Sequence, residues 1–308
     1  MPTKLEKGID WGGAKLRGLT VTYCFAEAGQ TMKTFSGKIE TVAFNAYEKA
    51  QFKLAFELYA SFTKLKFVAT KNQDSADFVL TAYQGDVKLL GTMGPPGTKV
   101  AGIGAFNVDG DGWDRDAPGT GALEQGGFGY ITIVHELGHG FGLAHPHDGG
   151  GGSPKFPGVQ EAGDFGKFGL NQGVYTTMSY NDGWKLDPDG LPPSVSAYGY
   201  QGTPMAIDIA VLQEKYGVNK TYHKGNDVYV LPDENGVGTF FSCIWDAGGR
   251  DAIVSRSASP TAIDLRAATL KVEPGGGGYI SYVDGIFGGY TIARKVVIEN
   301  AVGGSGDD

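Results

Sequence analysis

The feature that most constrains this chain is one run of residues, His135-Glu136-Leu137-Gly138-His139-Gly140-Phe141-Gly142-Leu143-Ala144-His145. The residues before it, from Tyr130 to Val134, contain no glycine and have a helical pattern. His135 and His139 are therefore expected one turn apart on a single helix face. Gly142 can adopt the left-handed conformation that ends a helix and turns the chain back, which would bring His145 towards the same point.

Three histidines in this arrangement predict a zinc site. Three nitrogen ligands leave one coordination position open for water, which is typical of catalytic rather than structural zinc. Glu136 is a poor ligand by its position, but it is well placed to take a proton from water at the metal and to pass it to a leaving amine. A chance clustering or a structural zinc site are the alternatives.

Two motifs identify a family resemblance. The run from His135 to His145 matches the metzincin signature, and Thr177-Met178-Ser179-Tyr180 resembles the Met-turn of that clan. Pro146 after the third histidine, with Tyr180, resembles the serralysin family of bacterial secreted proteases. The resemblance implies a zinc endopeptidase in which Met178 forms an apolar floor beneath the metal. It also implies that Tyr180 ligates zinc and supports the oxyanion, although a tyrosine merely packed nearby would look the same.

The resemblance extends from the region of Trp11 to the last residue and is strongest after Tyr130. Gly303 to Asp308 has the form of one calcium-binding repeat of a parallel β-roll. The family normally continues with several such repeats and a C-terminal export signal, which this sequence does not contain. We therefore expect a truncated or processed form, or a natural short variant.

Calcium sites in the tail are a further implication of the resemblance. The first joins the loop at His223 to Asp227 with the turn that follows Ile244, and its expected ligands are Gly225, Asp227, Asp246, Gly248, Gly249 and Asp251. Carboxylate and carbonyl oxygens are the ligands that calcium prefers, although a solvated turn is the alternative. Glu299 with Asp308 is expected to complete another site. Asp109 to Asp114 also resembles a calcium loop, but aspartate-glycine pairs are common in hairpin turns.

The order of patterns predicts an α+β fold in two domains. Residues 1–218 are expected to form a metzincin catalytic domain, with a twisted, mostly parallel sheet, long helices, an active-site helix and a Met-turn. Residues 219–308 are expected to form an all-β, glycine-rich tail, the truncated start of a β-roll or sandwich. Helical patterns run over 44–62, 127–141 and 204–216, with Thr203 as the cap of the last. Val100 to Val108 is the candidate strand against which an extended substrate would pair.

Composition excludes several classes of function. The formal net charge is −8 and no run of Lys and Arg is long enough to follow a phosphate backbone, so no nucleic-acid partner is expected. No segment has the apolar length of a membrane span, and the first residues lack the apolar core of a signal peptide. We expect a monomer that is secreted without a classical signal peptide and acts on proteins or peptides. The two cysteines, Cys24 and Cys243, are either buried thiols or one bridge.

A second interpretation belongs to a different class. A catalytically silent relative could serve as a calcium-binding or interaction module. The intact set of His135, Glu136, His139, His145 and Tyr180 argues against it, because a silent relative should have lost at least one of them. Subsite specificity, the physiological substrate and the number of calcium sites are beyond what the sequence predicts.

Overall fold

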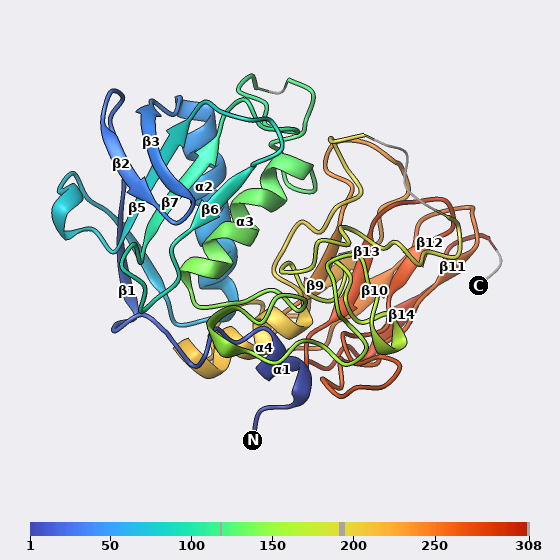
Figure 1. Cartoon of the computed structure of the whole chain (residues 1–308). Helices are drawn as coiled ribbons and strands as arrows, with labels where there is room; N and C mark the ends of the chain where they lie inside the picture. The colour runs from blue at the N-terminus through green and yellow to red at the C-terminus, as the bar shows by residue number, and fades with distance from the viewer. Residues whose placement is uncertain (118, 191–194, 307–308) are drawn as a thin grey trace.

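A computed structural model describes residues 1–117, 119–190 and 195–306. A sheet with its helices lies on one side of the molecule, a tail of short strands lies on the other, and α3 (Phe128–Gly140) runs near the centre (Figure 1). The fold is α+β, as predicted. Within the described residues, no helix is both long enough and apolar enough to cross a membrane.

Three helices frame the central region. α2 (Ala46–Phe62) begins with a capping box, in which the side chains of Asn45 and Glu48 each accept the other's backbone N–H. α3 ends where Gly142, at φ 88°, turns the chain back as the sequence predicts. α4 (Ala206–Tyr216) begins at Met205, whose N–H is accepted by Asp208, so the prediction that Thr203 caps this helix is wrong. The remaining helical segments are α1 (Lys4–Gly8), η1 (Gln73–Ser75), η2 (Gly150–Gly152) and η3 (Lys167–Gly169).

The first sheet is built around β5, which pairs with β1, β3 and β7. The pairings β1–β4, β1–β5 and β5–β7 are parallel, whereas β2–β3, β3–β5 and β6–β7 are antiparallel. The prediction of a mostly parallel sheet therefore holds only for the central strands. The β2–β3 hairpin and β6, which were not predicted, pair in antiparallel fashion. The strands are β1 (Thr20–Phe25), β2 (Thr31–Thr34), β3 (Gly37–Val42), β4 (Lys66–Ala69), β5 (Phe78–Tyr83), β6 (Gly91–Met93) and β7 (Ile103–Asn107).

The predicted substrate-pairing strand is wrong. Val100 to Val108 contains β7, which pairs with β5 on one side and β6 on the other and so has no free edge. Among the described residues, β6 pairs with β7 alone, so β6 is the strand at this edge. β6 could not be predicted from its residues, because Gly91–Met93 is too short to show alternation.

One face of the sheet carries the main core. Along β5, Phe78, Leu80 and Ala82 belong to the main hydrophobic cluster, whereas Val79 lies in a small second cluster with Cys24. This alternation is expected of a strand with helices on one side only. α2 and α3 cover that side and contact each other, and the Tyr59 hydroxyl of α2 donates to the Val134 carbonyl of α3 at 2.7 Å.

The tail contains two small sheets. One is parallel, in the order β14-β10-β8, and the other has the order β11-β12-β13-β9. Val296 to Glu299 does not form a strand, and β14 follows it. The strands are β8 (Val228–Val230), β9 (Phe241–Ile244), β10 (Ala252–Val254), β11 (Thr261–Ala262), β12 (Ser281–Val283), β13 (Gly289–Ile292) and β14 (Asn300–Val302).

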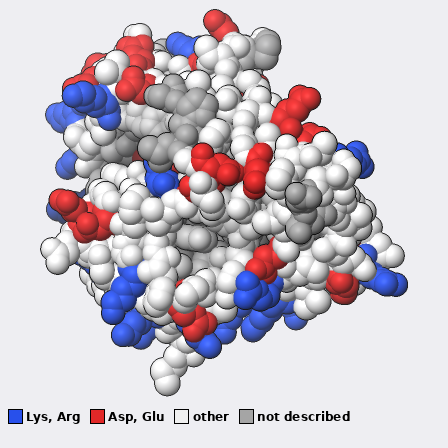
Figure 2. Space-filling view, turned by 90° about the vertical axis from the view of Figure 1, so that its right-hand side faces the viewer, with Lys and Arg blue, Asp and Glu red and all other residues white. Residues whose placement is uncertain are grey.

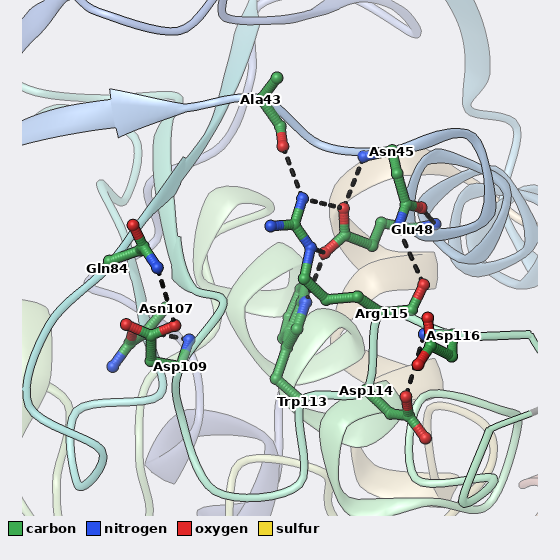
Figure 3. Close-up of polar contacts among 10 residues, drawn as sticks. All are labelled: Ala43, Asn45, Glu48, Gln84, Asn107, Asp109, Trp113, Asp114, Arg115 and Asp116. Carbon is green, nitrogen blue, oxygen red and sulfur yellow. Dashed lines mark hydrogen bonds and ion pairs between the residues drawn. The ribbon is translucent and has the colours of Figure 1, made fainter.

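The loop that follows β7 is fixed to the start of α2 rather than shaped around an ion. The guanidinium of Arg115 pairs with the buried Glu48 carboxylate at 2.9 Å, and Trp113 Nε1 donates to the same carboxylate at 2.8 Å (Figure 3). Asp109 accepts from Gln84, while Asp114 accepts from the backbone of Asp116 (Figure 3). The two aspartates thus point to different neighbours, which does not favour the calcium loop that the sequence suggests here.

Candidate metal centre

The three predicted histidines converge in the structure. His135 and His139 lie on successive turns of α3, and His145 follows the turn at Gly142. The Nε2 atom of His145 lies 3.0 Å from Nε2 of His135 and 3.0 Å from Nε2 of His139. We call these three residues the histidine cluster.

The other ring nitrogen of each histidine faces an acceptor. Nδ1 of His135 lies 2.8 Å from the Thr177 carbonyl, and Nδ1 of His139 lies 2.9 Å from the Leu143 carbonyl. Nδ1 of His145 lies 2.5 Å from the Asp148 carboxylate. Because carbonyl and carboxylate oxygens only accept, the proton of each neutral ring is assigned to Nδ1. All three Nε2 lone pairs then point at one another, and a cation between them would replace this repulsion with ligand bonds.

Electrostatics keep these rings neutral. Burial lowers the pKa of His135 to about 3 and that of His139 to about 3, and burial also lowers the pKa of His145 to about 4. Partial burial would raise the pKa of Asp148, but hydrogen bonds from His145 and Gly150 outweigh it and lower that pKa to about 2. Neutral imidazoles beside an ionised carboxylate are the donor set that a divalent transition metal requires. The residues therefore fit zinc.

Glu136 lies beside the histidine cluster at the edge of the first sheet. Its side chain is buried, and burial raises its pKa to about 8. A Cβ on Gly91 of β6 would lie 3.0 Å from Cγ of Glu136, so the glycine permits this close approach. His135 and Glu136 also line a cavity of about 330 Å³ between α3 and the residues after Met178. We call this space the site cavity.

The residues that precede Met178 are held in place by hydrogen bonds to Asp208. Met178 is fully buried. Asp208, also fully buried, accepts from Thr176 Oγ1 at 2.6 Å, from Thr177 N at 2.7 Å and from Met205 N at 2.8 Å. Since the Thr177 carbonyl in turn accepts from His135, Asp208 connects the start of α4 to the histidine cluster.

Tyr180 lies over the histidine cluster from the solvent side. Its side chain is 55% exposed, and its ring centroid lies 4.8 Å from that of His145 and 5.7 Å from that of His135. Partial burial raises the pKa of Tyr180 to about 12, and the nearby carboxylates of Glu136, Asp148 and Asp182 contribute to this increase. His147 stacks on His145 at 4.9 Å and lies 4.7 Å from Tyr180. His147 is thus half-buried in the site, although it lies in an irregular loop.

The predicted calcium residues of the tail lie close together and form a second cluster. Ligand atoms of His223, Asp227 and Asp246 all lie within 4.8 Å of one another. Asp227 N donates to Asp251 at 2.8 Å, and Gly248 N donates to Asp246 at 2.7 Å. A Cβ on Gly249 would overlap the Gly225 carbonyl oxygen, so these two loops touch. We call Asp227, Asp246, Asp251 and Glu299 the carboxylate cluster.

The carboxylate cluster contains buried oxygens without partners. Oδ2 of Asp227 and Oδ2 of Asp251 are buried and accept no hydrogen bond from the described residues. Burial raises the pKa of Asp251, and the neighbouring carboxylates of Asp246 and Glu299 raise it further. Hard oxygens that are buried, charged and unpaired fit calcium. Glu299 accepts from Asp251 N at 2.8 Å, while its expected partner Asp308 lies outside the described residues.

Three residues at the site were not predicted from the sequence. Asp148 and Asp182 lie in an irregular segment without periodicity, so nothing marked their side chains as facing the site. Asp208 lies in the part of the chain, after Tyr130, where the family resemblance is strongest, and that resemblance was the sequence signal that could have found it.

Elsewhere, Cys24 and Cys243 are both buried free thiols rather than a bridge. On the face shown in Figure 2, acidic and basic side chains are interspersed and neither forms a continuous band.

Comparison with known proteins gives one family. The family model described as "Peptidase M10 serralysin C terminal" matches residues 213–308. A protein named Serralysin from Proteus mirabilis is 30% identical over 97% of this chain and 60% of its own length. Serralysin C from Dickeya chrysanthemi is 30% identical with the same coverage, and Serralysin from Photorhabdus luminescens is 28% identical over 87% of this chain and 53% of its own. The chain thus spans about 60% of the length of the first two of these relatives.

Proposed function

This chain is a serralysin-like metzincin, and from that premise we propose that it is a zinc-dependent endopeptidase that hydrolyses internal peptide bonds of proteins. The observation that carries the proposal is the convergence of three Nε2 atoms whose rings are each held through Nδ1. His135, His139 and His145 would hold the ion. Zinc would supply Lewis acidity and lower the pKa of a coordinated water towards about 7.

The chain's own side chains would transfer the proton, stabilise the oxyanion and form the floor of the metal site. Glu136 would accept a proton at its carboxylate and return it to the leaving amine, because it faces the site cavity beside His135. Tyr180 would ligate the metal at rest and donate a hydrogen bond to the oxyanion when it moves aside, and its raised pKa favours a hydroxyl that keeps its proton. Met178 would form the apolar floor, since it is fully buried and its Sδ would lie 3.0 Å from a Cβ on Gly138 of α3.

Substrate would pair with β6 rather than with β7. The edge of β6 is free of described partners and lies against Glu136 through Gly91. An extended peptide added to this edge would place its backbone beside the histidine cluster. Protein substrates suit this chain better than nucleic acid does, because its formal net charge is −8 and its sequence has no long run of Lys and Arg.

The wider organisation is proposed on the same premise. Residues 1–218 would form the catalytic domain, and residues 219–308 would form a tail held by calcium at the carboxylate cluster. Gly225, Gly248 and Gly249 would add oxygen ligands to those of the carboxylates. The protein would act outside the cell as a monomer. A silent binding module is less well supported, because His135, His139 and His145 converge and Glu136 lines the cavity beside them.

The test is cleavage of quenched-fluorescent casein by wild-type protein and by Glu136→Ala. The variant should keep about one zinc per chain and lose activity by about 10³- to 10⁴-fold, because it removes the proton acceptor and leaves the histidines. Removing zinc with a chelator should abolish activity in the wild type, and adding zinc back should restore it. Glu161→Ala, an exposed glutamate, is the matched control and should retain activity.

Equal inactivity of wild type and Glu136→Ala at full zinc occupancy would sink the catalytic proposal. Wild-type activity that survives complete removal of zinc would sink the metal's role in it. The two failures are separate, because zinc content is measured independently of cleavage.

A further inference from the structure

The site cavity is lined by both apolar and acidic side chains. Its walls include the apolar side chains of Leu89, Leu90, Phe128 and Ile131, and its lining also includes the carboxylate of Asp182. His135 and Glu136 line the same cavity, so a group held there would lie beside the reacting centre. At about 330 Å³, the cavity can accept a long side chain.

Asp182 has few direct contacts that satisfy its charge, and the positive charge of Lys185 acts on it only from beyond 4.0 Å. Its Oδ1 accepts one long hydrogen bond, 3.3 Å from Gln201 Nε2. The Gln201 amide is itself fixed, because its Oε1 accepts from Gly183 N at 2.9 Å. Among the described residues, no Lys, Arg or His nitrogen lies within 4.0 Å of Asp182. A partly buried carboxylate in this situation gains from a cation brought by a ligand.

We propose that Asp182 makes this chain selective for substrates with an arginine or lysine directly beside the scissile bond. The proposal rests on the proposed function. The aliphatic stem of either residue would lie along the apolar walls, and its charged end would reach the Asp182 carboxylate. A neutral side chain of the same length would bury the carboxylate without a partner, so it is disfavoured.

Lys88 also lines the site cavity, and its positive charge disfavours a basic side chain of the substrate. It is exposed, so its long side chain can move away from the cavity. The neighbouring Leu89 and Leu90 contribute apolar surface, which either charge of substrate could use. Lys88 therefore weakens the preference for a basic residue without reversing it, and its removal should increase that preference.

The experiment cleaves a pair of peptides that differ only beside the cut bond, with arginine in one and glutamine in the other. Wild type should cut the arginine peptide with a kcat/KM at least about 10-fold higher than the glutamine peptide. Asp182→Asn keeps an acceptor for Gln201 but removes the charge, and it should reduce the ratio to below about 3. Lys88→Gln should raise the ratio. Because the ratio is taken within each variant, a general loss of activity cancels.

Asp116→Asn makes the same change of charge at an exposed aspartate outside the cavity, and its ratio should match that of wild type. Mass spectrometry of cleaved casein should place arginine or lysine on one side of most cut bonds. A wild-type ratio near one, or an Asp182→Asn ratio equal to that of wild type, overturns the inference and leaves the proposed function intact. If neither peptide nor casein is cut, the proposed function and this inference fall together.

Discussion

The histidine cluster and the carboxylate cluster differ in what each leaves unsatisfied before a metal binds. In the histidine cluster every ring is neutral and every Nδ1 has an acceptor at 2.9 Å or less. In the carboxylate cluster two buried oxygens have no described partner, and like charges face one another. The first is a nearly complete frame to which the metal adds chemistry. The second is incomplete, and the ion would contribute to holding the fold together.

This difference follows from where the ligands lie in the chain. His135 and His139 are positioned by a helix that is stable through its own hydrogen bonds and its packing on α2. Asp227, Asp246 and Asp251 lie in turns between short strands, which have few hydrogen bonds of their own. We therefore expect zinc to change activity far more than stability, and calcium to change stability first.

The largest effect is expected from removing the support beneath the histidine cluster. Asp208→Ala leaves three donors without a partner in a fully buried place, so the free energy of unfolding should fall by about 3 to 5 kcal/mol. Urea denaturation of the calcium-loaded protein measures this. Glu214→Ala, an exposed residue of the same helix, should have almost no effect. A small loss in Asp208→Ala would show that the frame does not depend on this carboxylate.

The same contrast explains how far the sequence could predict the structure. The spacing of His135, His139 and His145 predicted their convergence because helix geometry and one left-handed glycine determine it locally. The partner of His145, Asp148, could not be assigned, since any polar residue in an irregular loop can face solvent. The edge strand was misplaced for a similar reason. Pairing partners such as β5, β6 and β7 are selected by tertiary contacts that the pattern of one strand does not contain.

The next effect concerns the carboxylate cluster directly. Titration of calcium into calcium-free, zinc-loaded protein should stabilise it by about 2.7 kcal/mol at a calcium concentration 100 times Kd. Thermal unfolding at fixed zinc measures this as an increase in Tm. Asp251→Asn should remove most of the increase, because it takes away a buried unpaired oxygen. An equal rise in Tm from zinc alone, with no response to calcium, would reverse the comparison between the two clusters.

A smaller effect should come from the carboxylate behind His145. Asp148→Asn removes the charged acceptor of His145 Nδ1, so the ring becomes a weaker and less oriented ligand. Zinc affinity should fall by about 10- to 100-fold in a competitive chelator titration, with little change in the free energy of unfolding. Asp116→Asn provides the control for loss of one surface charge. An unchanged zinc affinity would show that the charge of Asp148 does not help His145 to bind the metal.

The smallest effect tests whether the carboxylate cluster has any support of its own. The Tyr229 hydroxyl donates to Asp246 at 2.6 Å, whereas the nearby Tyr290 hydroxyl donates to the Val230 carbonyl at 2.7 Å. Tyr229→Phe should lower the free energy of unfolding by about 1 kcal/mol in calcium-free protein, because it leaves one more carboxylate oxygen unpaired. With calcium bound the loss should be smaller, since the ion satisfies that oxygen. Tyr290→Phe should cost a similar amount in both conditions, because its acceptor is not a ligand. Equal behaviour of the two variants would mean that Asp246 does not respond to calcium, and that the carboxylate cluster is held by its hydrogen bonds after all.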